Sequence, residues 1–289
     1  SEARIEVYVQ SNQGNNTLSN EEIKQRLNED YQLDIAVNNN ELTAIAKVKN
    51  KNMNWKKALS ISFKVFVTNS IDTKLSTSGG SISLDHLSGN QHFRTSGGSL
   101  HVNDISGNID GRTSGGSITL NNSSGEIDLA TSGGSITSTD SKGDIKLHTS
   151  GGSLTLNDLK GKIDAATSGG SVKGEDIKGE LIAHTSGGSI NLKGLACSVE
   201  TSTSGGNIAV EIVKLGEYTK IENSGGNIAL EIPGGVGVNL DLHGNRINAS
   251  QLTNFSGTKD DDRISGTLNG GGVPVNVRAG SGKISLTLK

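Results

Sequence analysis

Residues 113–120 read TSGGSITL, and near-copies of this stretch occur along most of the chain. The copies are spaced 18 residues apart and begin at Thr77, Thr95, Thr113, Thr131, Thr149, Thr167, Thr185 and Thr203. A ninth copy, NSGGNIAL, begins at Asn223, 20 residues after the eighth, so two residues are inserted between Leu215 and Tyr218. A strict repeat of this kind is typical of a stacked array in which each repeat forms one coil.

Each repeat contains two short segments in which apolar and polar residues alternate. In TSGGSLTLNDLKGKIDAA, which begins at Thr149, Leu154 and Leu156 form one such pattern, and Ile163 and Ala165 form the second. Alternation with a period of two indicates a β-strand with one buried face. Glycines precede both segments, where the chain must turn. Each repeat therefore predicts two strands and two corners.

Aligning the repeats places apolar residues in two columns. With the threonine of TSGG as position 1, these are positions 6 and 15. Position 6 holds Ile82, Leu100, Ile118, Ile136, Leu154, Val172, Ile190, Ile208 and Ile228, and position 15 holds Ile109, Ile127, Ile145, Ile163, Leu181 and Val199. One coil cannot bury such a face alone, so the coils must pair as parallel strands at a spacing of ~4.8 Å. The sequence predicts an all-β fold, a parallel β-helix or β-solenoid with 18-residue coils, regular over 77–222 and irregular over 223–289.

Composition limits the classes of partner. The chain has 289 residues, 40 of them glycine, and a formal net charge of -3, which offers no general attraction for nucleic acid or an anionic membrane. No apolar run approaches the roughly 20 residues needed to span a bilayer, so we expect no membrane insertion of this chain. Cys197 is the single cysteine and forms no intrachain disulfide.

Residues 1–76 do not repeat and contain five of the eight aromatic residues. Ser19 and Glu22 have the spacing of a capping box, which predicts a helix up to about Asp30. Alternating segments at 5–10, 33–37, 42–48 and 59–67 predict strands, the middle two joined through residues 38–40. A solenoid needs a cover over its exposed apolar end, and we expect 1–76 to be this N-terminal α+β cap.

The motif decays after Gly226, but alternation continues at 238–242, 264–268, 273–277 and 284–288. The stretch AGSGKISL, from Ala279, repeats the pattern of TSGGSISL at residue 77. These features predict irregular coils that end in a strand whose charges, Lys283 and Lys289, discourage end-to-end pairing.

Three features together resemble a known family: the TSGGSI repeats, the segment KNMNWKKALSISFKVFV leading into LSTSGGSISL, and the closing ISGTLNGGG. They are similar to the adhesin-like β-strand-repeat proteins of the DUF4097 type, related to the DUF2807 group, over nearly the whole chain. The resemblance implies a right-handed β-helix and an exported protein of the cell surface or periplasm, its signal peptide removed. It supplies no catalytic residues.

Position 10 forms an acidic and amide column of Asp104, Asn122, Asp140, Asp158 and Asp176. Calcium-binding β-rolls also carry aspartates at each coil, but their G-G-x-G-x-D corners surround each ion with several oxygens, and these corners are absent here. The column fits the preference of Asp and Asn for turns better. Asp260, Asp261 and Asp262 are interpreted as a solvated loop, so we expect neither metal nor cofactor.

Two outward columns could face a partner. Position 7 holds Ser83, His101, Thr119, Thr137, Thr155, Lys173 and Asn191. His101 and Lys173 interrupt any flat threonine array of the ice-binding kind, so strand propensity explains the threonines. Position 18 holds Arg94, Arg112, His148 and His184, a mild positive stripe that is either a solvated face or a contact for an acidic glycan. His148 and His184 are two coils or ~9.6 Å apart, too far to share one metal ion.

Two further features have a structural and a functional interpretation. Cys197 replaces the glycine of position 13 and is interpreted as a semi-buried spacer, since no histidine partner for catalysis is in the pattern. A lysine group near Trp55 is either a soluble hairpin surface or a polyanion site. Its members are Lys47, Lys49, Lys51, Lys56 and Lys57.

The repeats from 77 to 202 contain no insertion long enough to build an enzyme cleft, and no acid–base cluster stands out, so we expect no catalytic residues. The leading hypothesis is a non-enzymatic, exported cell-envelope solenoid that presents a polar surface to a glycan or protein partner. The alternatives are a structural or signalling envelope module that binds through its N-terminal cap and, third, a polysaccharide-acting enzyme.

Overall fold

The computed structural model describes residues 3–12, 18–50, 58–249 and 251–289. The predicted fold class is confirmed, because strands dominate and coils of about 18 residues stack in parallel into a β-solenoid of about 9 turns. The chain divides into two compact units, Ser1–Thr68 and Asn69–Lys289. The second unit begins before the first TSGG motif, because β5 (Thr73–Thr77) pairs with the strand that follows it.

The described residues of the first unit form one helix and two pairs of antiparallel strands. Its elements are β1 (Arg4–Ser11), α1 (Asn20–Asp30), β2 (Tyr31–Asn38), β3 (Glu41–Val48) and β4 (Leu59–Phe66). β1 pairs with β4, and β2 with β3. The capping box is confirmed: the Glu22 amide donates to the Ser19 hydroxyl at 3.2 Å, and the Ser19 amide donates to the Glu22 carboxylate at 2.9 Å. Asn39 and Asn40 both have positive φ, as a tight hairpin turn requires.

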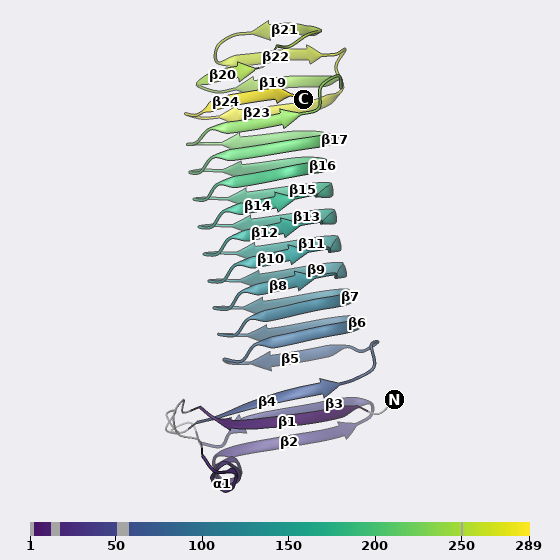
Figure 1. Ribbon diagram of the computed structural model, residues 1–289, viewed down its shortest axis with the longest axis vertical. Coiled ribbons are helices and arrows are strands. Elements are labelled where there is room, and N and C mark those ends of the chain that lie inside the picture. Colours follow the sequence, from purple (N-terminus) through teal and green to yellow (C-terminus); the bar gives the residue numbers. More distant parts are fainter. Residues whose placement is uncertain (1–2, 13–17, 51–57, 250) are drawn as a thin grey trace. The chain divides into compact units, whose positions relative to one another are not determined.

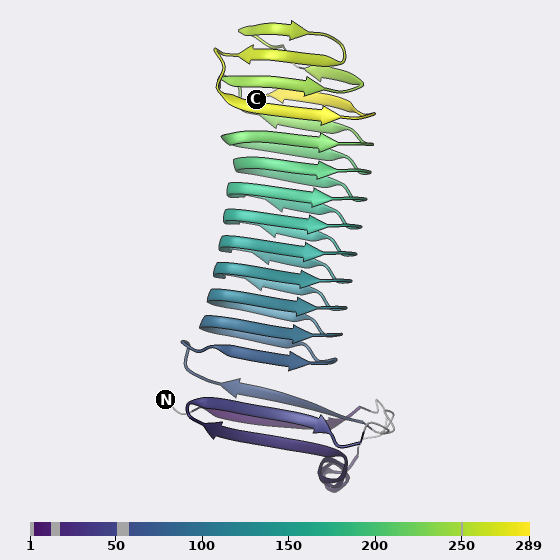
Figure 2. The ribbon, with the colours of Figure 1, turned by 180° about the vertical axis from the view of Figure 1, so that it is seen from behind.

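The second unit is a stack in which each coil contributes a short and a long strand (Figure 1; Figure 2 from behind). Short strands pair with short strands and long with long, all parallel and in register. The short ones are β8 (Ile118–Asn121), β10 (Ile136–Thr139), β12 (Leu154–Asn157) and β14 (Val172–Glu175). The long ones are β9 (Ser124–Thr131), β11 (Lys142–Thr149), β13 (Lys160–Thr167) and β15 (Lys178–Thr185). In four coils the short and the long strand form one continuous strand: β6 (Ile82–Thr95), β7 (Leu100–Thr113), β16 (Ile190–Thr203) and β17 (Ile208–Asn223). β18 (Ile228–Ile232) follows them.

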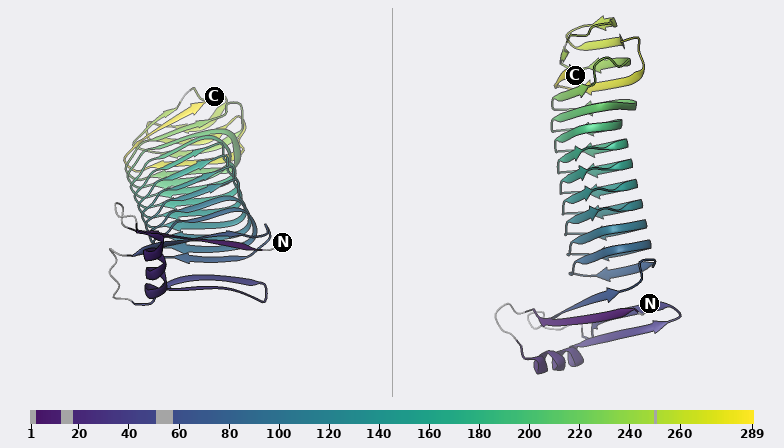
Figure 3. Two further views of the ribbon diagram at one scale, coloured as in Figure 1. Left: turned by 60° about the horizontal axis from the view of Figure 1, so that its bottom comes forward. Right: turned by 45° about the vertical axis from the view of Figure 1, so that its right-hand side comes forward.

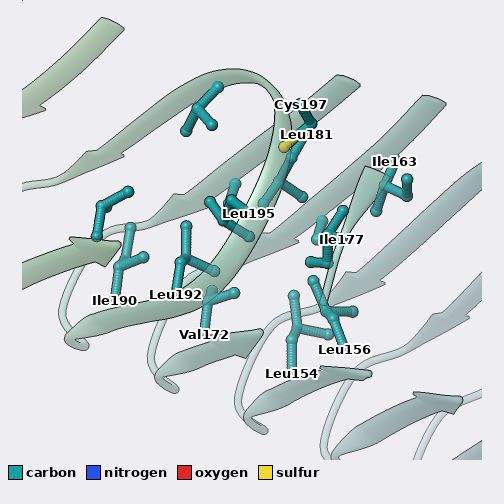
Figure 4. Close-up of a cluster of buried hydrophobic side chains, with 14 of the residues drawn as sticks. Leu154, Leu156, Ile163, Val172, Ile177, Leu181, Ile190, Leu192, Leu195 and Cys197 are labelled. Carbon is teal, nitrogen blue, oxygen red and sulfur yellow. The ribbon is translucent and has the colours of Figure 1, made fainter. Parts of the chain in front are cut away.

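The predicted apolar columns form the core of this unit. Every member of positions 6 and 15 named above is buried. Figure 4 shows Leu154, Leu156 and Ile163 pointing into the narrow space between the two rows of strands. The position 7 residues lie on the outer side, where Thr137 and Thr155 are half-buried and His101 and Lys173 are exposed. The inside and outside assignments of the coils are therefore confirmed.

The threonine at position 1 joins neighbouring coils at the TSGG corner. The Thr149 hydroxyl donates to the carbonyl oxygen of Gly134 on the preceding coil at 2.8 Å and accepts from the amide of Gly152 in its own corner at 3.2 Å. The same pair of bonds recurs at Thr95, Thr113, Thr131, Thr167 and Thr185. Hydroxyl hydrogen bonds between successive coils are therefore present at this position.

Replacing Thr149 by valine, which keeps the shape and removes the hydroxyl, should lower the free energy of unfolding by about 1–2 kcal/mol because two hydrogen bonds are lost. Denaturant melts followed by circular dichroism measure the change. Thr155→Val is the matched control, since this outward hydroxyl has no hydrogen-bond partner among the described residues. An equal loss in both variants would contradict the role given to position 1.

The C-terminal strands are stacked in a different order from the chain. They are β19 (Val238–His243), β20 (Arg246–Ala249), β21 (Phe255–Lys259), β22 (Arg263–Leu268), β23 (Val273–Ala279) and β24 (Lys283–Leu288). β23 pairs with β17 and β24 with β18, while β19 and β20 pair with the far sides of β23 and β24 (Figure 3). β22 then pairs antiparallel with β19, and β21 pairs antiparallel with β22.

The prediction that the stack ends in the last strand of the chain is therefore wrong. The stretch AGSGKISL forms the next corner above NSGGNIAL, because the Gly280 amide donates to the Asn223 carbonyl at 2.8 Å and the Lys283 amide to the Asn227 side chain at 3.0 Å. Lys289 does not guard an open edge. Its ammonium group pairs with Glu211 at 3.1 Å and with Glu231. The segment without the motif, β19 to β22, lies beyond this coil.

Candidate functional site

A shallow groove of about 440 Å³ follows the edge where the long strands enter the TSGG corners. We call it the axial groove. It is lined by residues from positions 18, 1 and 2 of successive coils, because the side chains of positions 18 and 2 point outward on either side of the inward threonine. Its outward residues are Ser76, Arg94, Ser96, Arg112, Ser114, Ala130, Ser132, His148 and Ser150.

The structure brings three of the four residues of the predicted positive stripe into this groove. Arg94 and Arg112 are paired in register on neighbouring strands, and His148 lies two coils beyond Arg112. His184 lies outside the groove, with its Nδ1 2.8 Å from the Ser202 hydroxyl. The stripe is thus a local feature of the first coils rather than of the whole solenoid.

The two arginines differ in their freedom. The Arg112 guanidinium pairs with Asp128 at 2.5 Å and with Asp110 at 2.9 Å, and donates to the Asp128 carbonyl at 2.6 Å. Arg94 makes a single, longer contact, 3.9 Å from its guanidinium to the Asp110 carboxylate, and its side chain is 59% exposed. Ion pairs this exposed add little to stability, but they fix the direction of the Arg112 side chain. Arg112 is therefore a positioned cation, and Arg94 has fewer contacts that fix its direction.

Sequence reasoning did not single out the serines at position 2 as candidate binding residues. Ser96, Ser114 and Ser132 are exposed, and among the described residues their hydroxyls make no intramolecular hydrogen bond. The available signal was the alternation itself, since the residue after an inward threonine must point outward. These serines place one uncommitted hydroxyl per coil along the groove.

The position 10 column occupies the left-handed turn conformation at the second corner. Asp104, Asn122, Asp140, Asp158 and Asp176 have φ between 48 and 55°, a region that Asp and Asn tolerate best after glycine. The turn interpretation accounts for the column. Within the described part of the chain, no group of three or more His, Cys, Asp or Glu side chains is placed to hold a metal ion.

We expect EDTA to leave the melting temperature unchanged, because each position 10 carboxylate lacks the ring of oxygens that calcium requires. Thermal melts with EDTA and with added calcium test this. A fall in melting temperature on chelation, reversed by calcium, would restore the β-roll interpretation.

A second hollow of about 610 Å³ lies where the coil gains two residues, and Lys178, Lys214, Cys197 and Tyr218 are among its lining residues. The predicted insertion is confirmed, because Cys197 pairs with Leu215 but Val199 pairs with Thr219. The Tyr218 hydroxyl donates to Glu180 at 2.7 Å, and this bond is the main reason that the pKa of Tyr218 rises to about 12. The hollow is a consequence of the bulge in β17.

Cys197 is more deeply enclosed than the expected semi-buried spacer. Only 2% of its surface is exposed, and burial raises the pKa of its thiol to about 12. The thiolate is the nucleophilic form, and at pH 8 roughly one thiol in ten thousand carries it at that pKa. The thiol is therefore suited to packing in the core, as Figure 4 shows.

Native protein should resist alkylation of Cys197 by iodoacetamide at pH 8, because the thiol is both buried and protonated. Mass spectrometry of the modified fraction measures this, and the chain unfolded in guanidinium, which should react quickly, is the control. Rapid labelling of the native protein would show that the β17 bulge opens in solution.

Other predicted features contribute less. Lys51, Trp55, Lys56 and Lys57 lie outside the described residues. The Lys49 ammonium donates to the Asn28 carbonyl at 2.5 Å. The remaining lysine of that group, Lys47, is paired with Gln32 in the β2–β3 hairpin. Asp260, Asp261 and Asp262 form the exposed connection between β21 and β22, as expected for a solvated loop.

No family model, curated protein or solved structure matches this chain. In its described part, no helix has the length and apolar character needed to cross a membrane. The resemblance to the DUF4097 type therefore rests on the sequence motifs alone.

Proposed function

We propose that this protein is a non-enzymatic, adhesin-like β-solenoid, exported to the cell surface or periplasm, that holds a glycan or protein partner in the axial groove. The observation that supports this is the combination of exposed Arg94 and His148 with a row of unbonded serine hydroxyls. The lining residues include no carboxylate, so a glycosidase pair of acids has no counterpart there. A shallow groove of donors is suited to binding without turnover.

One observation favours the second candidate, a module that binds through the N-terminal unit. Leu33, Ile35 and Val37 share one face of β2, and they are 36%, 46% and 66% exposed. Their partners across the hairpin are Ala46, Ala44 and Leu42, so the face is apolar on both strands. Exposed apolar patches of this kind often mark contact surfaces.

A deletion of whole coils tests the proposal against this alternative. Removing residues 113–148 joins Arg112 to Thr149 and preserves the repeat register. A ligand first found on a glycan array should bind more weakly to the shortened chain, because half of the groove is gone. The variant Ile35→Ser, Val37→Ser should bind as the wild type does. The reverse pattern would assign binding to the N-terminal unit and contradict the proposal.

A further inference from the structure

We infer that the axial groove accepts a linear anionic polysaccharide, lying parallel to the solenoid axis with successive sugars opposite successive coils. The inference rests on the proposed function and adds the chemical class and the orientation of the ligand. Three observations support it: the hydroxyl and basic side chains that line the groove, their spacing along the solenoid axis, and the lack of Phe, Tyr and Trp among the lining residues.

The polar side chains that line the groove are suited to a ligand rich in acceptors. They comprise serine and threonine hydroxyls, two guanidinium groups and one imidazole. The threonine hydroxyls are already bonded at the corners, whereas the serine hydroxyls have no hydrogen-bond partner within the part of the chain that the structure describes. The nearest carboxylates, Asp110 and Asp128, are engaged by Arg112 and His92. Carboxylates or sulfates on a ligand are the groups that guanidinium recognises best.

The spacing of these groups matches a polymer rather than a single sugar. Strands in register place one serine on each coil, so hydroxyls recur at ~4.8 Å along the axis. An extended polysaccharide repeats at a similar distance per sugar. Arg94 and Arg112 lie on adjacent coils and His148 two coils further, so basic side chains flank the row of hydroxyls over four coils.

The lining contains no Phe, Tyr or Trp side chain. Single-stranded nucleic acids are usually held by stacking of their bases on aromatic rings, and aromatic faces are likewise the natural platform for the apolar faces of neutral sugars. Without such a platform, the hydrogen bonds and charges of the groove must provide the affinity. This favours a charged polysaccharide over a neutral one.

Arg112 makes the site partly organised before binding. Its ion pairs with Asp110 and Asp128 hold the guanidinium in place, so a ligand does not have to order that side chain. Arg94 is less constrained and can turn toward the ligand. The axial groove therefore combines one fixed and one adjustable cation on neighbouring coils.

A second row of cations on the solenoid is a weaker candidate for the same ligand. Lys142, Lys160 and Lys178 are paired in register at position 12 and are exposed. Two residues before each is an exposed aspartate of position 10, which opposes the approach of an anion. This row, the lysine ladder, provides a test of where the ligand binds.

Calorimetric titration of the full chain with di-, tetra- and hexagalacturonate tests the inference, with maltohexaose as the neutral probe of matched length. Affinity should rise from the dimer to the hexamer, fall with added salt, and be lower for maltohexaose by about tenfold or more, the equivalent of one charge-assisted hydrogen bond. Arg94→Gln should lower the affinity for hexagalacturonate by a similar factor. Arg94 is exposed, so its variant should fold, and an unchanged melting temperature verifies this.

Arg278→Gln is the matched control, because Arg278 directly precedes the AGSGKISL corner as Arg94 precedes TSGG, yet lies on a distant coil outside the groove. It should bind as the wild type does, as should the variant with Lys142, Lys160 and Lys178 all changed to Gln. Loss of binding in the lysine variant alone would place the ligand on the lysine ladder and overturn the inference. Equal binding of maltohexaose, unaffected by Arg94→Gln, would also overturn it while leaving the proposed function intact. If neither oligosaccharide binds, the inference fails, and the proposed function then depends on the coil-deletion experiment alone.

Discussion

Gly152→Ala is expected to lower the free energy of unfolding by about 3 kcal/mol or more, enough to disrupt the stack. A Cβ atom on Gly152 would lie 2.0 Å from the carbonyl oxygen of Gly134 on the preceding coil. The atom that it meets is backbone, and the backbone also fixes the position of a Cβ atom, so no side-chain rotation can relieve the overlap. The same close approach recurs at Gly116, Gly134, Gly170 and Gly188, which is why the second glycine of TSGG is needed at each coil.

The neighbouring residue provides the control. A Cβ atom on Gly151 would meet nothing closer than 3.5 Å, and neither glycine has positive φ. Gly151→Ala should therefore change stability by less than about 1 kcal/mol, and it can stabilise the chain by restricting its unfolded state. Guanidinium melts of the two variants measure the difference. Equal destabilisation would show that the contact between coils does not explain why the second glycine of TSGG recurs in every repeat.

Ile145→Ala is expected to cost about 2–5 kcal/mol, because it removes a fully buried side chain from the middle of the core. Its neighbours in the column are Ile127 and Ile163, which pair with it on the two adjacent strands. Each coil contacts chiefly its neighbours, so a cavity in one coil weakens the stack on both sides. Denaturant melts should show a lower midpoint and, if the solenoid splits, a broader transition.

Lys146→Ala tests the register in the same strand. Lys146 is exposed and points away from the core, so its truncation should change stability by no more than about 0.5 kcal/mol. A shift of one residue would exchange the two faces of β11. A larger effect for Lys146→Ala than for Ile145→Ala would contradict the assignment of the outer surface, and with it the axial groove.

The regular coils could be predicted almost completely from the sequence. Alternation with a period of two determines which side of each strand is buried, and the 18-residue period determines which residues are neighbours on adjacent coils. Leu154 and Val172 are paired for this reason alone. The capping box at Ser19 and the turn at Asn39 and Asn40 are equally local, because each depends on residues within one turn of chain.

The candidate site could be predicted only in part. Arg94, Arg112 and His148 share a position in the repeat, so their common column follows from spacing. These residues form one groove with Ser96 and Ser114 because the backbone bends at the TSGG corner. The spacing of the repeat in the sequence does not describe this bend. The ion pairs of Arg112 also required the structure, because they depend on side-chain directions within β7 and between β7 and β9.

The order of the C-terminal strands was decided by the tertiary structure alone. The motif at 279–286 predicts a further coil, but the sequence does not determine which earlier coil this segment stacks against. Contacts between corners select the place above NSGGNIAL, and the chain between Ile232 and Val273 folds beyond it as β19 to β22. The free energy of closing a loop grows only with the logarithm of its length, so a long excursion costs little more than a short one. Corner contacts, and not chain order, therefore set the neighbours at this end of the solenoid.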